Sequence, residues 1–294
     1  MRNVWIIAQR ELGAYFGTPL AYIFVVVFVA LTGAFAFFIG NFFERGQADL
    51  QAFFSYHPWL YLLLVPAIAM RLWAEEMKSG TIELLMTLPI ATWEAIVAKF
   101  LAAWAFIGIA LLLTVPMWIT VNYLGQPDNG VIRASYIGSF LMAGAFLAIG
   151  SSISALTRNQ VIAFIVTATL CFLFVMSGAE LVLNVVRNVT LGRIVQIGGT
   201  VLAVIGLVLA AMRGDVGGAV TALVAVPVAL LVGWLIGDLG SGFLVQAISS
   251  LSFLSHFEQV TKGVIGLPTL VFYASMIAFF LFANIVIVEM RKAA

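Results

Sequence analysis

The chain has 294 residues, of which 63% are hydrophobic and 9% are charged, and its mean hydropathy is +1.14. Soluble domains carry about 25% charged residues, so this composition excludes a soluble globular protein and leaves no room for a large soluble domain. The net charge of +1 gives no support to nucleic-acid binding, and the single cysteine, Cys171, excludes a disulfide bond within the chain. We therefore expect an all-α, multi-pass membrane protein with one transmembrane domain over residues 1–294.

The first 18 residues predict an amphipathic helix that lies along the cytoplasmic face and leads into the first span. One apolar face repeats at helical spacing, through Trp5, Ala8, Leu12 and Tyr15. Gly17 and Pro19 mark the end of this helix. The apolar run before Arg10 and Glu11 is too short for the hydrophobic region of a signal peptide.

Six apolar segments have about the length that a membrane-spanning helix needs, which is about 20 residues. They cover roughly residues 20–40, 58–73, 93–121, 135–156, 160–183 and 267–288. Two further apolar runs, 194–212 and 216–236, predict an extra helix pair within residues 184–238, giving about eight spans. Residues 239–266 predict an external amphipathic segment. The loop at residues 41–57 is expected to be polar and external.

Residues 74–92, between the second and third spans, form the most informative polar segment. Gly80 predicts the end of one helix, and Thr81 can cap the start of the next. Glu83 would then lie in the first turn, where the helix dipole favours a negative charge, and Pro89 prevents continuation. The sequence therefore predicts a short helix over residues 82–88, which cannot span a bilayer.

This short helix needs a covering partner, because so short and apolar a helix is not stable alone in water. Leu84, Leu85 and Leu88 supply much of its apolar surface. Acidic residues outnumber basic ones around it: Glu75, Glu76, Glu83 and Glu94 against Lys78 and Lys99. Helices that lie in anionic lipid headgroups usually carry Lys and Arg instead. The pattern therefore favours a protein groove with a basic rim over a membrane surface.

The segment from Arg71 to Pro89 resembles the cytoplasmic coupling segment of ABC-2 type transporter permeases, most of all those of the gliding-motility-associated family. The matching residues there are Glu75, Glu76, Gly80, Thr81, Glu83, Leu84, Leu85, Leu88 and Pro89. Shorter matches occur at 10–11, 19–22, 156–160, 254–257 and 263–265. The resemblance thus covers most of the chain, except roughly residues 184–245.

The resemblance implies a permease with a six-span core that works with a separate ABC ATPase subunit, which would hold the ATP and magnesium. The nine matching residues would dock that subunit, and Trp5, Arg10, Glu11 and Tyr15 would belong to a helix that braces the same cytoplasmic surface. It also implies a second permease copy or a related permease, and it leaves room for a periplasmic or membrane accessory protein. The expected location is the inner membrane of a bacterium.

Lysine and arginine in short loops indicate the orientation. With both termini in the cytoplasm, nine of these residues lie inside: Arg2, Arg10, Arg71, Lys78, Lys99, Arg158, Arg213, Arg291 and Lys292. Five lie outside: Arg45, Arg133, Arg187, Arg193 and Lys262. The excess inside predicts that both termini are cytoplasmic.

The sequence holds no phosphate-binding G-x-x-x-x-G-K-[ST] loop, no H-E-x-x-H motif and no G-x-S-x-G motif. We therefore expect no catalytic residue, cofactor or metal in this chain. A secondary carrier or scramblase is an alternative, although Glu180 is its only candidate acid within a span, and an interfacial carboxylate explains Glu180 more simply. A non-transporting scaffold that recruits envelope proteins is the third hypothesis.

Overall fold

The computed structural model describes residues 2–81, 90–180, 182–184, 196–203, 206, 225, 227–228, 230–232 and 245–293. Within these residues every regular element is a helix, which confirms the predicted all-α class. The chain divides into two compact units, Met1–Leu173 with His256–Ala294, and Phe174–Ser255. In the second unit, the rings of Phe174 and Phe253 are 5.5 Å apart. The first unit holds the features described below.

The N-terminal part of the first unit is a pair of helices joined by a short bend. Helix α1 covers Arg2–Phe16, α2 covers Pro19–Ala34, and the π-helical turn η1 follows over Phe35–Ile39. Thr18 is extended at the bend, with φ −111° and ψ 139°. A proline has no N–H and pushes the preceding residue out of the helical region, so the helix restarts at Pro19.

The predicted external loop at residues 41–57 is more compact than its polar residues suggested. It contains the short helix α3 (Gln51–Ser55) and leads into α4 (His57–Ala69). Phe53, Phe54 and His57 are fully or almost fully buried, and His57 Nδ1 lies 2.7 Å from Ser139 Oγ. The loop therefore covers the end of the helix bundle with its aromatic side chains.

The sequence predicts one continuous helix from the second span into residues 74–79, but the structure divides it at Met70 into α4 and α5 (Arg71–Ser79). The side chain of Ser154, on a different helix, occupies the break. Its Oγ accepts hydrogen bonds from the backbone N–H groups of Trp73 (3.1 Å) and Ala74 (3.0 Å) and donates one to the carbonyl of Met70 (3.0 Å). A side chain inserted into the backbone ladder is a known cause of helix breaks.

The remaining helices are α7 (Thr92–Leu112), α8 (Val115–Leu124), α9 (Asn129–Ser154), α10 (Gln160–Met176), α14 (Phe253–Thr261) and α15 (Leu267–Ala293). In the described part of the chain, four helical stretches are long and apolar enough to cross a membrane: Ala21–Ile39, Thr92–Leu124, Asn129–Ser154 and Leu267–Arg291. Helix α10 is apolar but shorter. Most of residues 184–238, where the extra helix pair is predicted, lies outside the described residues, so the pair stays a prediction, although residues 196–203 are described and helical.

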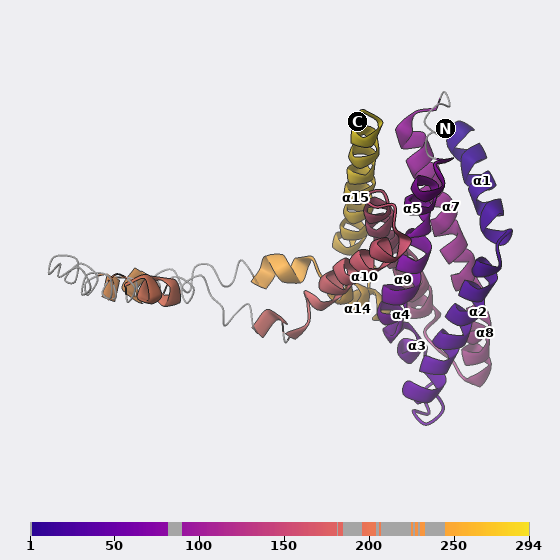
Figure 1. The fold of residues 1–294 in the computed structure, drawn as a ribbon. Helices are drawn as coiled ribbons and strands as arrows, with labels where there is room; N and C mark the ends of the chain where they lie inside the picture. The colour runs from indigo at the N-terminus through magenta and orange to yellow at the C-terminus, as the bar shows by residue number, and fades with distance from the viewer. Residues whose placement is uncertain are drawn as a thin grey trace. The chain divides into compact units, whose positions relative to one another are not determined.

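Helix α9 is the central helix of the first unit, with α4, α7 and α15 packed around it (Figure 1). Its residues 142–152 are all buried. Gly138, Gly144 and Gly150 explain how neighbours approach it from several sides. Because residues six apart in an α-helix differ by about 240° in direction, these glycines point in three directions about 120° apart.

Each of these glycines faces a different neighbour. A Cβ atom on Gly138 would lie 2.6 Å from Val260 of α14, and one on Gly144 would lie 2.7 Å from Trp104 of α7. On Gly150 it would overlap Ala69 of α4 and lie 2.9 Å from Thr167 of α10. The spacing of six, which does not form one helical face, therefore provides close packing on three faces of a central helix.

We expect Gly150→Ala to reduce the free energy of unfolding by about 1–3 kcal/mol, because the added methyl group overlaps α4 in a close-packed core. Gly33→Ala in α2 is the matched control, since a Cβ atom added there would meet nothing within 4 Å. The control should keep or slightly gain stability, because alanine is the better helix former. Thermal unfolding in detergent measures both, and an equal effect of the two substitutions would contradict this packing.

Candidate functional site at the junction of α1, α5 and α7

Helix α5 is the described part of the predicted coupling segment. It ends at Gly80, which has φ +75° and ψ 1°, a left-handed conformation that glycine adopts without steric cost. Beyond it, Thr81 Oγ1 lies 2.9 Å from Ser79 Oγ. The other predicted docking residues, Glu83, Leu84, Leu85, Leu88 and Pro89, lie outside the described residues, so their role stays a prediction.

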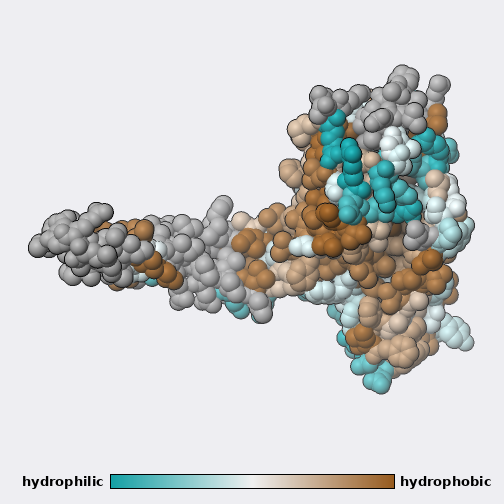
Figure 2. Space-filling view, in the orientation of Figure 1, coloured by the Kyte–Doolittle hydropathy of each residue, from teal (hydrophilic) through white to brown (hydrophobic). Residues whose placement is uncertain are grey.

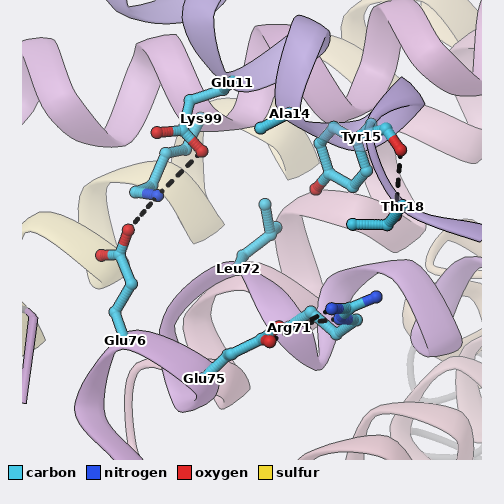
Figure 3. A pocket seen from close by; sticks show the side chains of 9 residues that line it. All are labelled: Glu11, Ala14, Tyr15, Thr18, Arg71, Leu72, Glu75, Glu76 and Lys99. Carbon is cyan, nitrogen blue, oxygen red and sulfur yellow. Dashed lines mark hydrogen bonds and ion pairs between the residues drawn. The ribbon is translucent and has the colours of Figure 1, made fainter. Parts of the chain in front are cut away.

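A buried lysine joins α1, α5 and α7 through ion pairs, and its contact with α5 lies at Glu76, four residues before Gly80. Lys99 of α7 is 3% exposed, and its Nζ lies 2.6 Å from Glu76 Oε1 of α5 and 3.1 Å from Glu11 Oε2 of α1. The same ammonium group lies 5.6 Å from the centre of the Trp73 ring. One cation therefore holds two acidic side chains from two helices, as Figure 3 shows.

A second ion pair lies within α5. Arg71 donates from Nε to Glu75 Oε2 (2.7 Å) and from Nη2 to Glu75 Oε1 (3.1 Å), which is the bidentate geometry that arginine favours. Glu75 and Glu76 were predicted to pair with basic groups on a partner protein. In the structure both already have a cationic partner within the chain, and about half of the Glu75 side chain remains exposed. Docking by these two residues stays a prediction.

The four predicted bracing residues all lie on α1, but they do not share one environment. Tyr15 stacks on Phe106 of α7, with ring centres 5.3 Å apart, and Glu11 reaches Lys99. Arg10 is exposed and pairs with Glu11 at 2.7 Å. Trp5 is 66% exposed.

The buried face of α1 agrees with the predicted one at Ala8, Leu12 and Tyr15 and departs from it at Trp5. Ala8 packs against Ala98 and Ala102 of α7. Val4, Ile7 and Leu12 join this contact, whereas Trp5 is largely exposed. The periodicity predicted a helix with an apolar face. The neighbouring helix decided which part of that face is covered, because α1 is apolar over more of its circumference than one contact can bury.

Helix α5 is also held from the side of α9. Besides the bonds that Ser154 makes to its first turn, Ser151 Oγ accepts from Trp73 Nε1 at 3.3 Å and from Asn284 Nδ2 of α15 at 2.6 Å. These groups are buried, and interhelical hydrogen bonds between such groups add to the packing of membrane helices. Any movement of α5 must therefore act on α1, α7, α9 and α15 together.

Sequence reasoning missed Lys99 and Ser154 as members of this candidate site. Lys99 was counted only as a charge, although a lysine inside an apolar segment is itself a signal for a buried, paired cation. Ser154 had no such signal, because a serine in a small-residue patch fits close packing equally well. Only the three-dimensional position shows that it caps a different helix.

The junction lines an open pocket of about 200 Å³. Its lining includes Glu11, Tyr15, Arg71, Glu75 and Lys99, and Figure 3 shows the Lys99 ion pairs and the Arg71–Glu75 pair on either side of Leu72. Figure 2 shows that hydrophilic side chains gather at this end of the bundle, while hydrophobic ones cover its flanks. No group of three or more metal-binding side chains is placed to hold a metal ion in the described residues.

The electrostatics of the junction depend on charge pairing. Burial by itself raises the pKa of the Glu11 carboxyl, but the charge of Lys99 and the hydrogen bonds from Arg10 and Lys99 outweigh burial, so the pKa is lowered from its ordinary value. A carboxyl with a lowered pKa stabilises the folded state at neutral pH, and this contribution is lost as the pH falls below about 4.5.

We expect Lys99→Met to cost about 3–5 kcal/mol of stability, because it leaves two acidic groups without their shared cation. Adding Glu11→Gln and Glu76→Gln should recover most of this loss. Lys78→Met is the control, since Lys78 is exposed, and it should change stability by less than about 0.5 kcal/mol. Thermal unfolding measured against pH should show the difference between wild type and Lys99→Met shrinking under acid. A constant difference would contradict this account of the junction.

Comparison with known proteins identifies the family of this chain. The model of the family described as "ABC-2 family transporter protein" matches residues 5–289, which is nearly the whole chain. A search of curated proteins finds no match. The predicted family is thus confirmed at the level of ABC-2 transporters, and the apolar helices agree with a membrane-embedded transport component. The chain therefore belongs to the ABC-2 family of transporter proteins.

Proposed function

We propose that this chain is the membrane-spanning permease subunit of an ATP-driven exporter in the inner membrane of a bacterium. A separate ABC ATPase subunit would bind ATP and magnesium, and a second copy of this chain or a related permease would complete the transmembrane part. We also propose that the chain is related to the gliding-motility-associated permeases, that it works with an accessory envelope protein, and that both of its termini are cytoplasmic. The chain itself would be no enzyme and would bind no nucleic acid.

The observation that carries the proposal is how firmly α5 is attached to the bundle. Lys99 joins α5 to α1 and α7, Ser154 joins its first turn to α9, and Trp73 shares Ser151 with Asn284 of α15. A helix attached in this way is suited to carry a displacement from a docked partner into the spans. A flexible linker would absorb the same displacement.

The proposed mechanism is mechanical. Closure of the ATPase dimer on ATP would push on residues 82–89, and α5 would move as a lever about the break at Met70. The break suits this role because the hydrogen bonds of Ser154 replace those of a continuous helix and leave a defined hinge. Helix α1 would resist the displacement through Lys99 and limit its direction.

Leu85→Asp tests the docking of the ATPase. If a partner groove covers Leu84, Leu85 and Leu88, each should contribute about 1.5–3 kcal/mol to docking, and an unpaired carboxylate in that groove costs more. The variant should insert and fold as wild type does but lose the ATPase subunit on co-purification. Glu83→Ala is the matched control and should lose much less, since an exposed ion pair contributes only about 0–1 kcal/mol. Full retention of the ATPase by Leu85→Asp would overturn this docking.

Cysteine labelling tests the orientation. In a Cys171→Ser background, we expect Arg213→Cys to react only with membrane-permeant reagents, because the charge bias places residue 213 inside. Arg45→Cys, in the exposed part of the first loop, should react with impermeant reagents on intact cells. The opposite labelling of either position would contradict the proposed orientation.

A further inference from the structure

A second hollow adjoins the junction pocket. It has a volume of about 230 Å³, lies between α2 and α4, and is lined by apolar side chains such as Phe24, Val27, Leu64 and Ile68. Both hollows are lined by Tyr15, Thr18 and Arg71. These shared residues place the charged junction pocket next to the apolar hollow beside the first span. We call the two together the cleft, with the junction pocket as its mouth and the apolar hollow as its channel.

The position of this cleft along α2 matches the change from the headgroup region to the hydrocarbon region of a bilayer. The apolar span in α2 and η1 begins at Ala21, so Thr18 and the mouth lie where the chain leaves the hydrocarbon region. The channel continues along α2 to Val27. Nine residues of helix from Thr18 cover about 13 Å, close to the thickness of one leaflet's hydrocarbon half, which is about 15 Å. The channel therefore has the length and polarity that suit one acyl chain.

The charges at the mouth indicate the kind of headgroup. Lys99 is already shared by Glu11 and Glu76, so it offers little to a ligand. Arg71 and Glu75 are more accessible, with side chains 25% and 47% exposed. Arg71 gives two of its five N–H groups to Glu75, which leaves three for a phosphate, and Figure 3 shows the Tyr15 hydroxyl pointing into the same pocket.

A purely anionic headgroup fits this mouth poorly, because the lining already carries three carboxylates, Glu11, Glu75 and Glu76, against the two cations Arg71 and Lys99. A headgroup with a phosphate and an ammonium group satisfies both sides: the phosphate accepts from Arg71 and Tyr15, and the ammonium donates to Glu75. We propose that this cleft binds one zwitterionic phospholipid of the bilayer, with an acyl chain between α2 and α4 and the headgroup at Arg71 and Glu75. The proposal does not depend on the ATPase partner.

The test uses the full-length chain, equilibrated with vesicles of equal parts phosphatidylethanolamine and phosphatidylglycerol and then extracted in mild detergent. Native mass spectrometry counts the phospholipids that each chain retains. We expect one phosphatidylethanolamine per chain, favoured about tenfold over phosphatidylglycerol, because one well-placed charged pair discriminates at about that level.

Two tryptophan substitutions on α4 separate a built site from general lipid contact. Ala67 lines the channel, so Ala67→Trp should fill it and reduce retention about tenfold. Leu63 is 56% exposed on the same helix and does not line the channel, so Leu63→Trp should retain the lipid as wild type does. Val27→Trp fills the channel from α2 and replaces Ala67→Trp if that variant does not fold.

A third variant tests the headgroup contact. Arg71→Lys keeps the positive charge but loses the planar set of donors that binds the phosphate, so it should lower the amount of phosphatidylethanolamine retained several-fold while the acyl channel stays open. The proposal is overturned by any of three results. The first is equal lipid retention by the channel-filling variants and Leu63→Trp. The second is a preference for phosphatidylglycerol. The third is a spread of several weakly bound lipids of both kinds, with no species that holds one lipid per chain.

Discussion

The structure depends on one buried cation. Lys99 lies in an apolar helix, and removing an ammonium group from water costs several kcal/mol unless acidic partners compensate. Its two partners come from α1 and α5, which are 65 residues apart in sequence between Glu11 and Glu76. Because the buried ammonium group is stabilised by both carboxylates, α1 and α5 are held against α7 as one assembly.

Helix α9 provides the framework against which this assembly is held. Three glycines let α4, α7, α10 and α14 approach it closely, and two serines on the same helix make the hydrogen bonds that fix α5. The small size of these residues explains both the close approach of the helices and the hydrogen bonds between them. They permit short interhelical distances, and at short distances a serine hydroxyl reaches the backbone of the neighbouring helix. The break at Met70 is a direct consequence.

The proposed lever and the proposed lipid site both include the first turns of α5, directly after the break at Met70. Arg71 and Glu75 lie on α5, directly after the break, and also at the mouth of the cleft between α2 and α4. A phospholipid bound there would contact the first turn of the moving helix, so the composition of the bilayer would influence how readily α5 turns. In these two proposals, lipid binding and the movement of α5 would both involve the first turn of this helix.

The sequence alone determined the class of protein, the family and the helical character of the described residues. Composition excludes a soluble domain, and the pattern around Gly80 predicted a helix end that the left-handed backbone there explains. These features are local or additive: hydropathy sums along the chain, and a glycine's conformational freedom does not depend on distant residues. The same reasoning identified the segment from Arg71 to Pro89 as the one most indicative of function.

Only the tertiary structure decided how these parts are connected. It showed that Glu75 and Glu76 already have cationic partners, that Trp5 lies outside the buried face of α1, and that α4 ends at Met70 rather than continuing into α5. Three of these findings depend on residues that are far away in the sequence: Glu76 pairs with Lys99, the covered face of α1 is set by the surface of α7, and the break after α4 is made by Ser154. The pair of Arg71 and Glu75 is local. Periodicity and composition carry no information about which distant helix will supply a partner, because that choice is made when the helices pack.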